Sequence, residues 1–149
     1  MTSQNIQQTH SVEETIALGK AIGAQLHAGD IVTLNGDLGA GKTHFTKGVA
    51  LSLCINEDIT SPTFPILLEY DGTDANGNQQ TLLHFDFYRL ESEDQLEDIG
   101  WYEFCESGAI VLVEWADMFP DSLPDKRLDV KITLDEHGTR TFAFTQKGQ

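Results

Sequence analysis

The chain has 149 residues, of which 40% are hydrophobic, so it is long enough for one buried core and too short for two. No segment approaches the roughly 20 consecutive apolar residues that a membrane-spanning helix needs. The formal net charge of −15, with only nine Lys and Arg residues, argues against direct binding of nucleic acid. We therefore expect a single soluble domain, residues 1–149, whose acidic surface either maintains solubility or docks on a basic protein face.

The N-terminal residues and the cysteines give no sign of export. Residues 1–10 are polar and lack a basic leader followed by an apolar core, which predicts no secretory signal and a cytoplasmic location. Cys54 and Cys105 have apolar neighbours and form no close pair in the sequence. We expect two reduced, packed thiols rather than a disulfide or a metal site.

The first third of the chain predicts a helix, a strand and a second helix in that order. Ser11 and Glu14 have the spacing of a capping box, and apolar residues then recur on one helical face from about Val12 to Leu26. A short β-prone run at residues 31–35 leads into a glycine-rich segment. A second helical pattern extends from Lys42 to about Leu53.

Two antiparallel hairpins are predicted further along. Residues 62–70 and 80–88 are rich in aromatic and β-prone types, and turn-forming residues at 71–79 connect them. Residues 128–134 alternate apolar and polar side chains, and a β-prone segment at 141–144 follows after a glycine. Each pair is expected to form a hairpin.

A helix and a buried strand are expected between these hairpins. Glu91 to Asp98 is strongly acidic, and Ser92 and Gln95 have capping spacing, which predicts one helix that ends before Gly108. Ala109 to Val113 is an uninterrupted apolar run, which is typical of a parallel strand covered on both faces.

Residues 36–43 match the phosphate-binding pattern Gly-x-x-x-x-Gly-Lys-Thr. In such a loop, backbone N–H groups turn inward around the phosphates, and the next helix directs its positive dipole end at the anion. Lys42 would neutralise charge on the β- and γ-phosphates, and the Thr43 hydroxyl would bind Mg²⁺. The predicted phosphate-binding residues are Asp37, Leu38, Gly39, Ala40, Gly41, Lys42, Thr43 and His44.

The predicted fold class follows from this order of elements. Strand, glycine loop and helix, together with a buried apolar strand, indicate an α/β fold. We expect a single P-loop NTPase domain with a mostly parallel central sheet, flanked by helices and antiparallel hairpins, that binds ATP over residues 1–149.

Two acidic residues are candidates for the second Mg²⁺ ligand. Glu114 ends the buried apolar strand, where a Walker B acid is expected. Asp86 lies on an alternating strand and shares a face with His84 and Tyr88. We assign the metal to Glu114, and we assign to Asp86 the orientation of the attacking water or the sensing of the γ-phosphate. Alternatively, Asp86 is a surface carboxylate paired with Arg89.

Other polar residues remain open between a functional and a structural role. Thr60 and Ser61 lie where related folds place a switch segment over the γ-phosphate, or they only cap a turn. Arg89 either stabilises charge in the transition state or belongs to a surface ion pair. His84 either pairs with Asp86 at a metal or is a structural imidazole, and we favour the structural role.

Four motifs occur in order along the chain: Gly36-Asp37-Leu38-Gly39-Ala40-Gly41-Lys42-Thr43, Ser61-Pro62-Thr63-Phe64, His84-Phe85-Asp86-Phe87-Tyr88-Arg89-Leu90 and Val113-Glu114-Trp115. Together they resemble the TsaE (YjeE) family of bacterial ATPases, over about Thr15 to Pro124. The role of that family is in making threonylcarbamoyladenosine on tRNAs that read codons beginning with A.

The resemblance implies ATP and Mg²⁺ as cofactors and TsaD and TsaB as protein partners, with tRNA contacted only through the complex. Hydrolysis of ATP would be slow in the isolated chain and would reset the complex between turnovers. For the phosphates the resemblance implies Gly39 to Thr43, and for Mg²⁺ it implies Thr43 and Glu114. The catalytic residues would be Lys42, Asp86 and Glu114. Ser11 and Val12 would belong to the adenine pocket, and Trp115 would lie near the nucleotide or in the core.

Two rival functions use the same loop. A small-molecule kinase of this fold usually needs a basic lid, and the nine Lys and Arg residues show no such cluster. A GTPase-like switch generally carries Asn-Lys-x-Asp, and no asparagine here precedes a lysine. A partner-activated ATPase therefore fits the sequence best.

Overall fold

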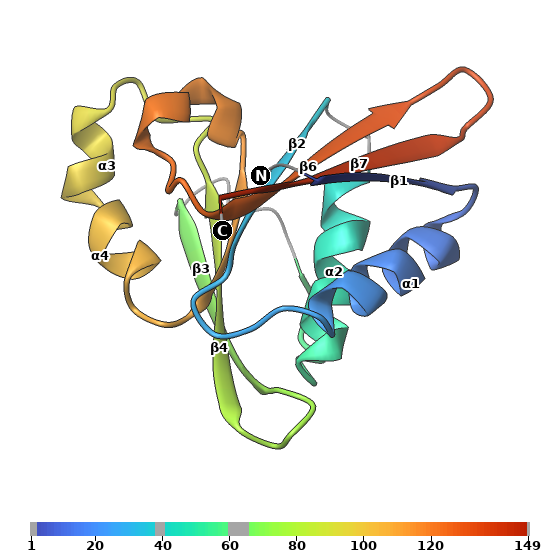
Figure 1. Cartoon of the computed structure of the whole chain (residues 1–149), viewed down its shortest axis with the longest axis horizontal. Coiled ribbons are helices and arrows are strands. Elements are labelled where there is room, and N and C mark those ends of the chain that lie inside the picture. Colours follow the sequence, from blue (N-terminus) through green and yellow to red (C-terminus); the bar gives the residue numbers. More distant parts are fainter. Residues whose placement is uncertain (1–2, 38–40, 60–65, 149) are drawn as a thin grey trace.

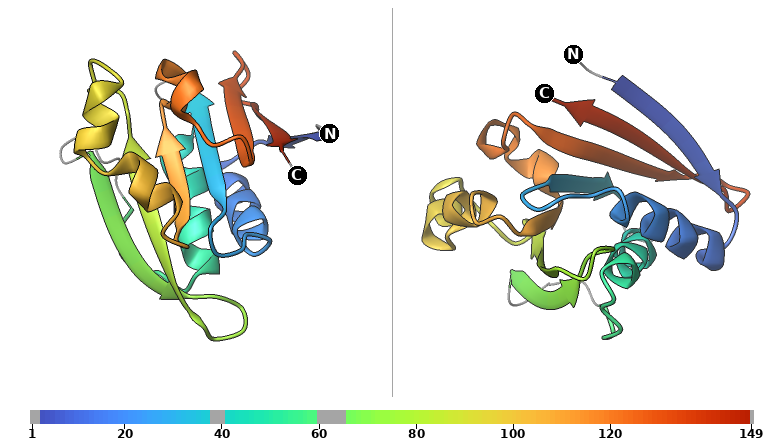
Figure 2. Two further views of the ribbon diagram at one scale, coloured as in Figure 1. Left: turned by 60° about the vertical axis from the view of Figure 1, so that its left-hand side comes forward. Right: turned by 60° about the horizontal axis from the view of Figure 1, so that its bottom comes forward.

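The computed structural model describes residues 3–37, 41–59 and 66–148. These residues form one seven-stranded sheet in the order β1-β7-β6-β2-β5-β4-β3, with helices on both faces (Figures 1 and 2). The strands are β1 (Ser3–Thr9), β2 (Ile31–Gly36), β3 (Leu67–Thr73), β4 (Gln79–Asp86), β5 (Ile110–Glu114), β6 (Arg127–Leu134) and β7 (Arg140–Lys147). The helices are α1 (Val12–Gly23), α2 (Lys42–Ser52), α3 (Asp94–Asp98), α4 (Trp101–Cys105) and the 3-10 turns Ala116–Met118 and Pro120–Ser122.

The middle of the sheet is parallel, which confirms the predicted fold class. Strand β2 pairs in parallel with both β5 and β6, and β4 pairs in parallel with β5. The outer pairs β3–β4 and β6–β7 are antiparallel hairpins, as their sequences predicted. The carboxyl ends of β2, β4 and β5 therefore meet at one edge of the sheet, where open α/β folds place their ligands.

Each face of the sheet has its own apolar core. Under α1 and α2, Phe45 and Val49 pack on alternate strand residues that include Leu112. Under α3 and α4, the fully buried Trp101 meets Phe85 edge to face, with ring centroids 5.1 Å apart. Strand β5 is thus covered on both sides, which explains its uninterrupted apolar sequence.

Helices α1 and α2 cross at glycines. A Cβ atom on Gly48 would lie 2.1 Å from the carbonyl oxygen of Ile16 and 2.8 Å from the Cα of Gly19. A Cβ atom on Gly19 would lie 2.2 Å from the carbonyl oxygen of Phe45. The two backbones approach so closely that only glycine fits, and this contact fixes α1 beside α2 (Figure 1).

Strand β1 was not predicted. It pairs antiparallel with β7 at the edge of the sheet, and its side chains are exposed from Gln4 to Gln8. A polar segment can form such an edge strand because it needs only one backbone partner and buries little apolar surface.

Three further expectations are corrected. The single helix after Ser92 is two short helices, because Gly100 has a φ of +82° between them, and the expected side-chain cap at Ser92 does not form. Strand β3 extends into the predicted turn as far as Thr73. Cys54 is exposed rather than packed, although both cysteines are free thiols.

The first helix ends at Gly23, three residues earlier than expected, while its predicted capping by Ser11 is present. None of the helices in the described ranges is both long and apolar enough to cross a membrane.

Candidate functional site

The predicted phosphate-binding loop joins the end of β2 to the start of α2. Residues Leu38, Gly39 and Ala40 lie outside the described residues. Gly41 precedes the helix with a φ of +109°, a left-handed conformation that side chains other than glycine adopt at a cost. The glycine that the motif requires is therefore also required by the local backbone.

The Lys42 side chain is buried, with 6% of its surface exposed, and its ammonium group lies near Gly36, Glu114 and Trp115. Nζ donates a hydrogen bond of 2.9 Å to the carbonyl oxygen of Gly36. It also lies 3.9 Å from Oε1 of Glu114 and 4.3 Å from the ring centroid of Trp115. This positive charge stands at the amino end of α2, where the helix dipole adds to the attraction for an anion.

Asp86 and Glu114 come together as direct partners in the register between β4 and β5. Both are buried, with 5% and 2% of their surface exposed. The alternative that Asp86 is a surface carboxylate paired with Arg89 is therefore wrong, and Arg89 itself is exposed. Instead, Asp86 accepts a hydrogen bond of 2.8 Å from the backbone N–H of Tyr88.

Burial raises the pKa of Asp86 above its ordinary value of 3.8, and the negative charge of Glu114 raises it further. The hydrogen bond from Tyr88 and the positive charge of Lys42 lower the pKa, but the upward effect dominates. A carboxylate with a raised pKa is a better proton acceptor, which is the property expected of a residue that orients an attacking water.

His84 contacts the second oxygen of Glu114. Its Nε2 atom lies 2.6 Å from Oε2 of Glu114, and the imidazole is fully buried. The sequence suggested either a metal pair of His84 with Asp86 or a structural imidazole. The observed partner of His84 is Glu114, and the sequence did not reveal this contact because it links neighbouring strands 30 residues apart.

The donor set around Lys42 fits a hard cation such as Mg²⁺. The Thr43 side chain is exposed on the first turn of α2, and Asp86 and Glu114 offer carboxylate oxygens at the same edge of the sheet. Among the described residues no group of three or more His, Cys, Asp or Glu side chains forms a metal cage. Mg²⁺ commonly uses one or two protein oxygens together with phosphates and water, so a cage is not required.

Trp115 directly follows β5 and has a left-handed backbone, with a φ of +60°. Its ring lies beside the ammonium of Lys42 and 4.9 Å from the ring of the exposed Tyr88. The side chain is half-buried and also packs against the core under α3 and α4. Trp115 thus lies at the predicted site and takes part in the core as well.

Arg140 is a site neighbour that the sequence did not identify. A Cβ atom on Gly41 would lie 2.9 Å from Cδ and Nε of Arg140, and 3.8 Å from Cγ2 of Thr15. Arg140 begins β7, which is two strands away from β2 in the sheet order, and its side chain reaches Gly41. No motif in the sequence connects the two.

The remaining predicted site residues lie on separate elements. Ser11 caps α1 by accepting a hydrogen bond from the Glu14 N–H, and Val12 is exposed at the start of the helix. Asp37 is exposed and His44 is half-buried. The predicted switch residues Thr60 and Ser61 lie outside the described residues.

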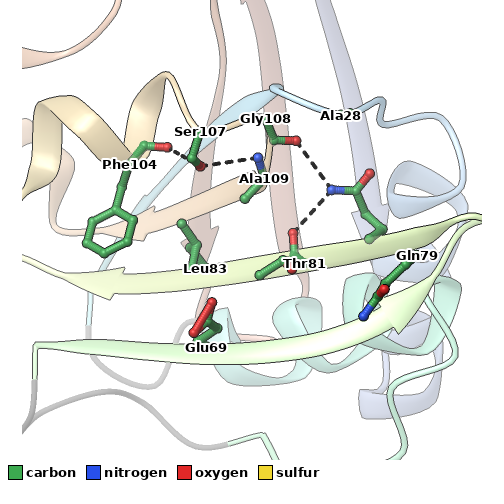
Figure 3. Close-up of a pocket in the computed structure, with 10 residues that line it drawn as sticks. Ala28, Glu69, Gln79, Thr81, Leu83, Phe104, Ser107, Gly108 and Ala109 are labelled. Atoms are coloured by element: carbon green, nitrogen blue, oxygen red, sulfur yellow. Dashed lines mark hydrogen bonds between the residues drawn. The ribbon is translucent and has the colours of Figure 1, made fainter.

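Two cavities lie at the opposite edge of the sheet from Asp86 and Glu114. One of about 330 Å³ is lined where β4 and β5 begin, by residues that include Thr81, Leu83 and Ala109 (Figure 3). Gln80 closes part of it with hydrogen bonds to the carbonyl oxygens of Thr81 and Gly108. The other, of about 980 Å³, lies where β2 and β6 begin. Neither is lined by the predicted site residues.

The fold and site define a mixed α/β protein with a lysine at the start of a helix and two buried acids at the ends of adjacent parallel strands. The family model for "Threonylcarbamoyl adenosine biosynthesis protein TsaE" matches residues 9–142 of this chain. The chain therefore belongs to the TsaE family, which is involved in threonylcarbamoyladenosine biosynthesis.

Individual relatives agree with this family. The Bacillus subtilis "tRNA threonylcarbamoyladenosine biosynthesis protein TsaE" is 42% identical over 140 residues, which cover 94% of this chain and 84% of the relative. The protein of the same name from Treponema pallidum is 37% identical over 132 residues, covering 89% and 93%. A solved structure titled "Crystal structure of Bacillus subtilus YdiB" is similar with a TM-score of 0.78 at 38% identity, covering 99% of this chain and 88% of that one.

Proposed function

We propose that this chain binds ATP with Mg²⁺ and hydrolyses it, slowly alone and faster with the TsaB and TsaD subunits, in the synthesis of threonylcarbamoyladenosine on tRNA. The observation that supports this most directly is the buried ammonium of Lys42, held at the amino end of α2 between Gly36 and Glu114. A buried cation at the amino end of a helix is suited to a triphosphate.

The proposed reaction is in-line attack of water on the γ-phosphate. Lys42 and the loop amides stabilise the negative charge that develops on the phosphoryl oxygens. Asp86 orients the water, and its raised pKa favours acceptance of a proton. Thr43 and Glu114 would hold the Mg²⁺, which would neutralise negative charge on the phosphates.

The net charge of −15 supports a role in which another protein contacts the tRNA. Acidic surface favours association with a basic face of a partner, and closure by a partner can exclude water and position the nucleophile. We place this activity in the cytoplasm.

Titration with ATP and with GTP tests the binding step, and Lys42→Ala provides the key variant. A charge-assisted hydrogen bond contributes about 1.5–3 kcal/mol, so Lys42→Ala should weaken ATP binding by roughly tenfold or more. Lys47→Ala is the matched control, because Lys47 is exposed on the same helix, and it should leave affinity unchanged. Equal affinity of wild type and Lys42→Ala would refute the assignment.

Measurement of the hydrolysis rate with and without TsaB and TsaD tests the reaction. A tenfold rise in rate corresponds to about 1.4 kcal/mol of barrier supplied by the partners. ATP consumption that requires a small acceptor molecule would instead support a kinase. A preference for GTP would support a GTPase-like switch.

A further inference from the structure

His84 lies in the interior of β4, between β3 and β5, and is fully buried. Its register partners are the apolar residues Leu68 and Leu112. Leu82, two positions earlier and on the same face, belongs to the apolar core under α2. A polar ring in such surroundings needs a hydrogen-bond partner to offset the loss of water.

The contacts of the ring define its tautomer. Nε2 lies 2.6 Å from Oε2 of Glu114, whereas Nδ1 is buried and has no hydrogen-bond partner in the described part of the chain. A proton on Nδ1 would therefore be a buried donor without an acceptor. The neutral ring with its proton on Nε2 avoids this, and it donates to the carboxylate of Glu114.

This hydrogen bond fixes the orientation of the Glu114 carboxylate. The terminal torsion of a glutamate side chain is broad, so the carboxylate of an unrestrained glutamate samples many rotations. Here Oε2 accepts from His84, and Oε1 is the oxygen that lies 3.9 Å from the ammonium of Lys42. Oε2 of Glu114 is thus directed toward His84, and Oε1 is directed toward Lys42 at the predicted phosphate site.

We propose that His84 is a positioning residue that orients Glu114 for the Mg²⁺ of the bound nucleotide. This inference rests on the proposed function, because it assigns to Glu114 the role of metal ligand. His84 itself contacts neither metal nor phosphate in this arrangement. The residue acts through one hydrogen bond, from Nε2, and a replacement that keeps a donor at that position should keep the effect.

Two amide variants test the position of the donor. The side-chain nitrogen of His84→Gln can lie near the place of Nε2, whereas that of His84→Asn is one bond shorter and lies near the place of Nδ1. Removal of an outer partner of a metal ligand typically lowers metal affinity by about 10- to 100-fold. We expect His84→Asn to weaken binding of ATP with Mg²⁺ by about tenfold or more, and His84→Gln to recover most of that affinity.

Binding of ATP in EDTA separates positioning from a general structural role. Neither variant should change affinity for metal-free ATP, because Lys42 and the loop amides remain. A loss in His84→Asn that is equal with and without Mg²⁺ would overturn the inference, as would equal affinity of the two variants for ATP with Mg²⁺. Thermal unfolding of each variant establishes that the compared proteins are folded.

Nitrogen NMR of ¹⁵N-histidine-labelled wild-type protein, without added nucleotide, tests the tautomer independently. The His84 ring should show a protonated Nε2 and an unprotonated Nδ1, and Glu114→Ala should disturb this pattern. A proton on Nδ1 would overturn the inference whether or not ATP binds. If wild-type protein shows the expected ring but binds no ATP, the proposed function fails, and with it the metal role of Glu114, while the hydrogen bond itself stands.

Discussion

Replacement of Gly48 by alanine should destabilise the protein, although alanine is the better helix former. Three backbone atoms of α1 would lie within 2.8 Å of the new Cβ atom, the nearest at 2.1 Å from the carbonyl oxygen of Ile16. Backbone cannot rotate away as a side chain can, so the two helices must separate and lose packing. Overpacking of this kind costs about 3 kcal/mol at the upper end of its usual range.

The helical preference for alanine offsets about 1 kcal/mol of this cost, which leaves a net loss of about 2 kcal/mol. For a chain of this length, the Tm should fall by roughly 4–8 °C. Urea unfolding monitored by circular dichroism gives the free energy directly, and the m value should not change.

Lys47→Ala is the matched control for Gly48→Ala, because it changes an exposed position one residue earlier in α2. Its effect should stay within about 0.5 kcal/mol. If Gly48→Ala were as stable as wild type, or more stable as helix propensity alone would require, the close approach of α1 and α2 would be refuted.

Two further substitutions probe the site. Asp86→Asn should raise the Tm at neutral pH. The raised pKa means that the folded state disfavours the charged carboxylate, so wild-type protein loses stability as the pH rises from the ordinary pKa of 3.8 through the raised pKa. Asparagine stays neutral and does not lose this stability. Thermal melts over a pH series should show this gain shrinking to nothing in acid, and a gain that grows in acid would contradict the direction of the shift. Thr43→Ala should weaken binding of ATP with Mg²⁺ more than binding of ATP in EDTA, and calorimetric titration that finds equal losses would remove Thr43 from the metal site.

The parallel middle of the sheet could be predicted because its signals are local. The apolar run before Glu114 can be buried only between two layers, and the glycine pattern before Lys42 marks a turn from strand to helix. Glu114 was expected at the end of its strand and Asp86 on an alternating strand, and the two residues are register partners. A pattern within one segment was enough for each of these predictions.

The features that were missed depend on contacts between distant segments. Strand β1 forms because β7 offers an edge for pairing, and the polar sequence of β1 does not predict a strand. Arg140 reaches Gly41 only through the order of strands in the sheet. The bond between His84 and Glu114 needs the pairing of β4 with β5 in one particular register, and Gly100 divides a helix that its acidic sequence predicted as continuous.

The neighbours of Lys42 affect the rate at which a bound phosphate would be released. When an anion leaves a buried lysine, the ammonium group normally loses its partner, and this cost slows release of the anion. Here the ammonium can return to a resting position with a carbonyl oxygen at 2.9 Å, a carboxylate and an aromatic ring. Such a resting position lowers the affinity for the anion and shortens its residence, as the proposed cycle of ATP hydrolysis requires.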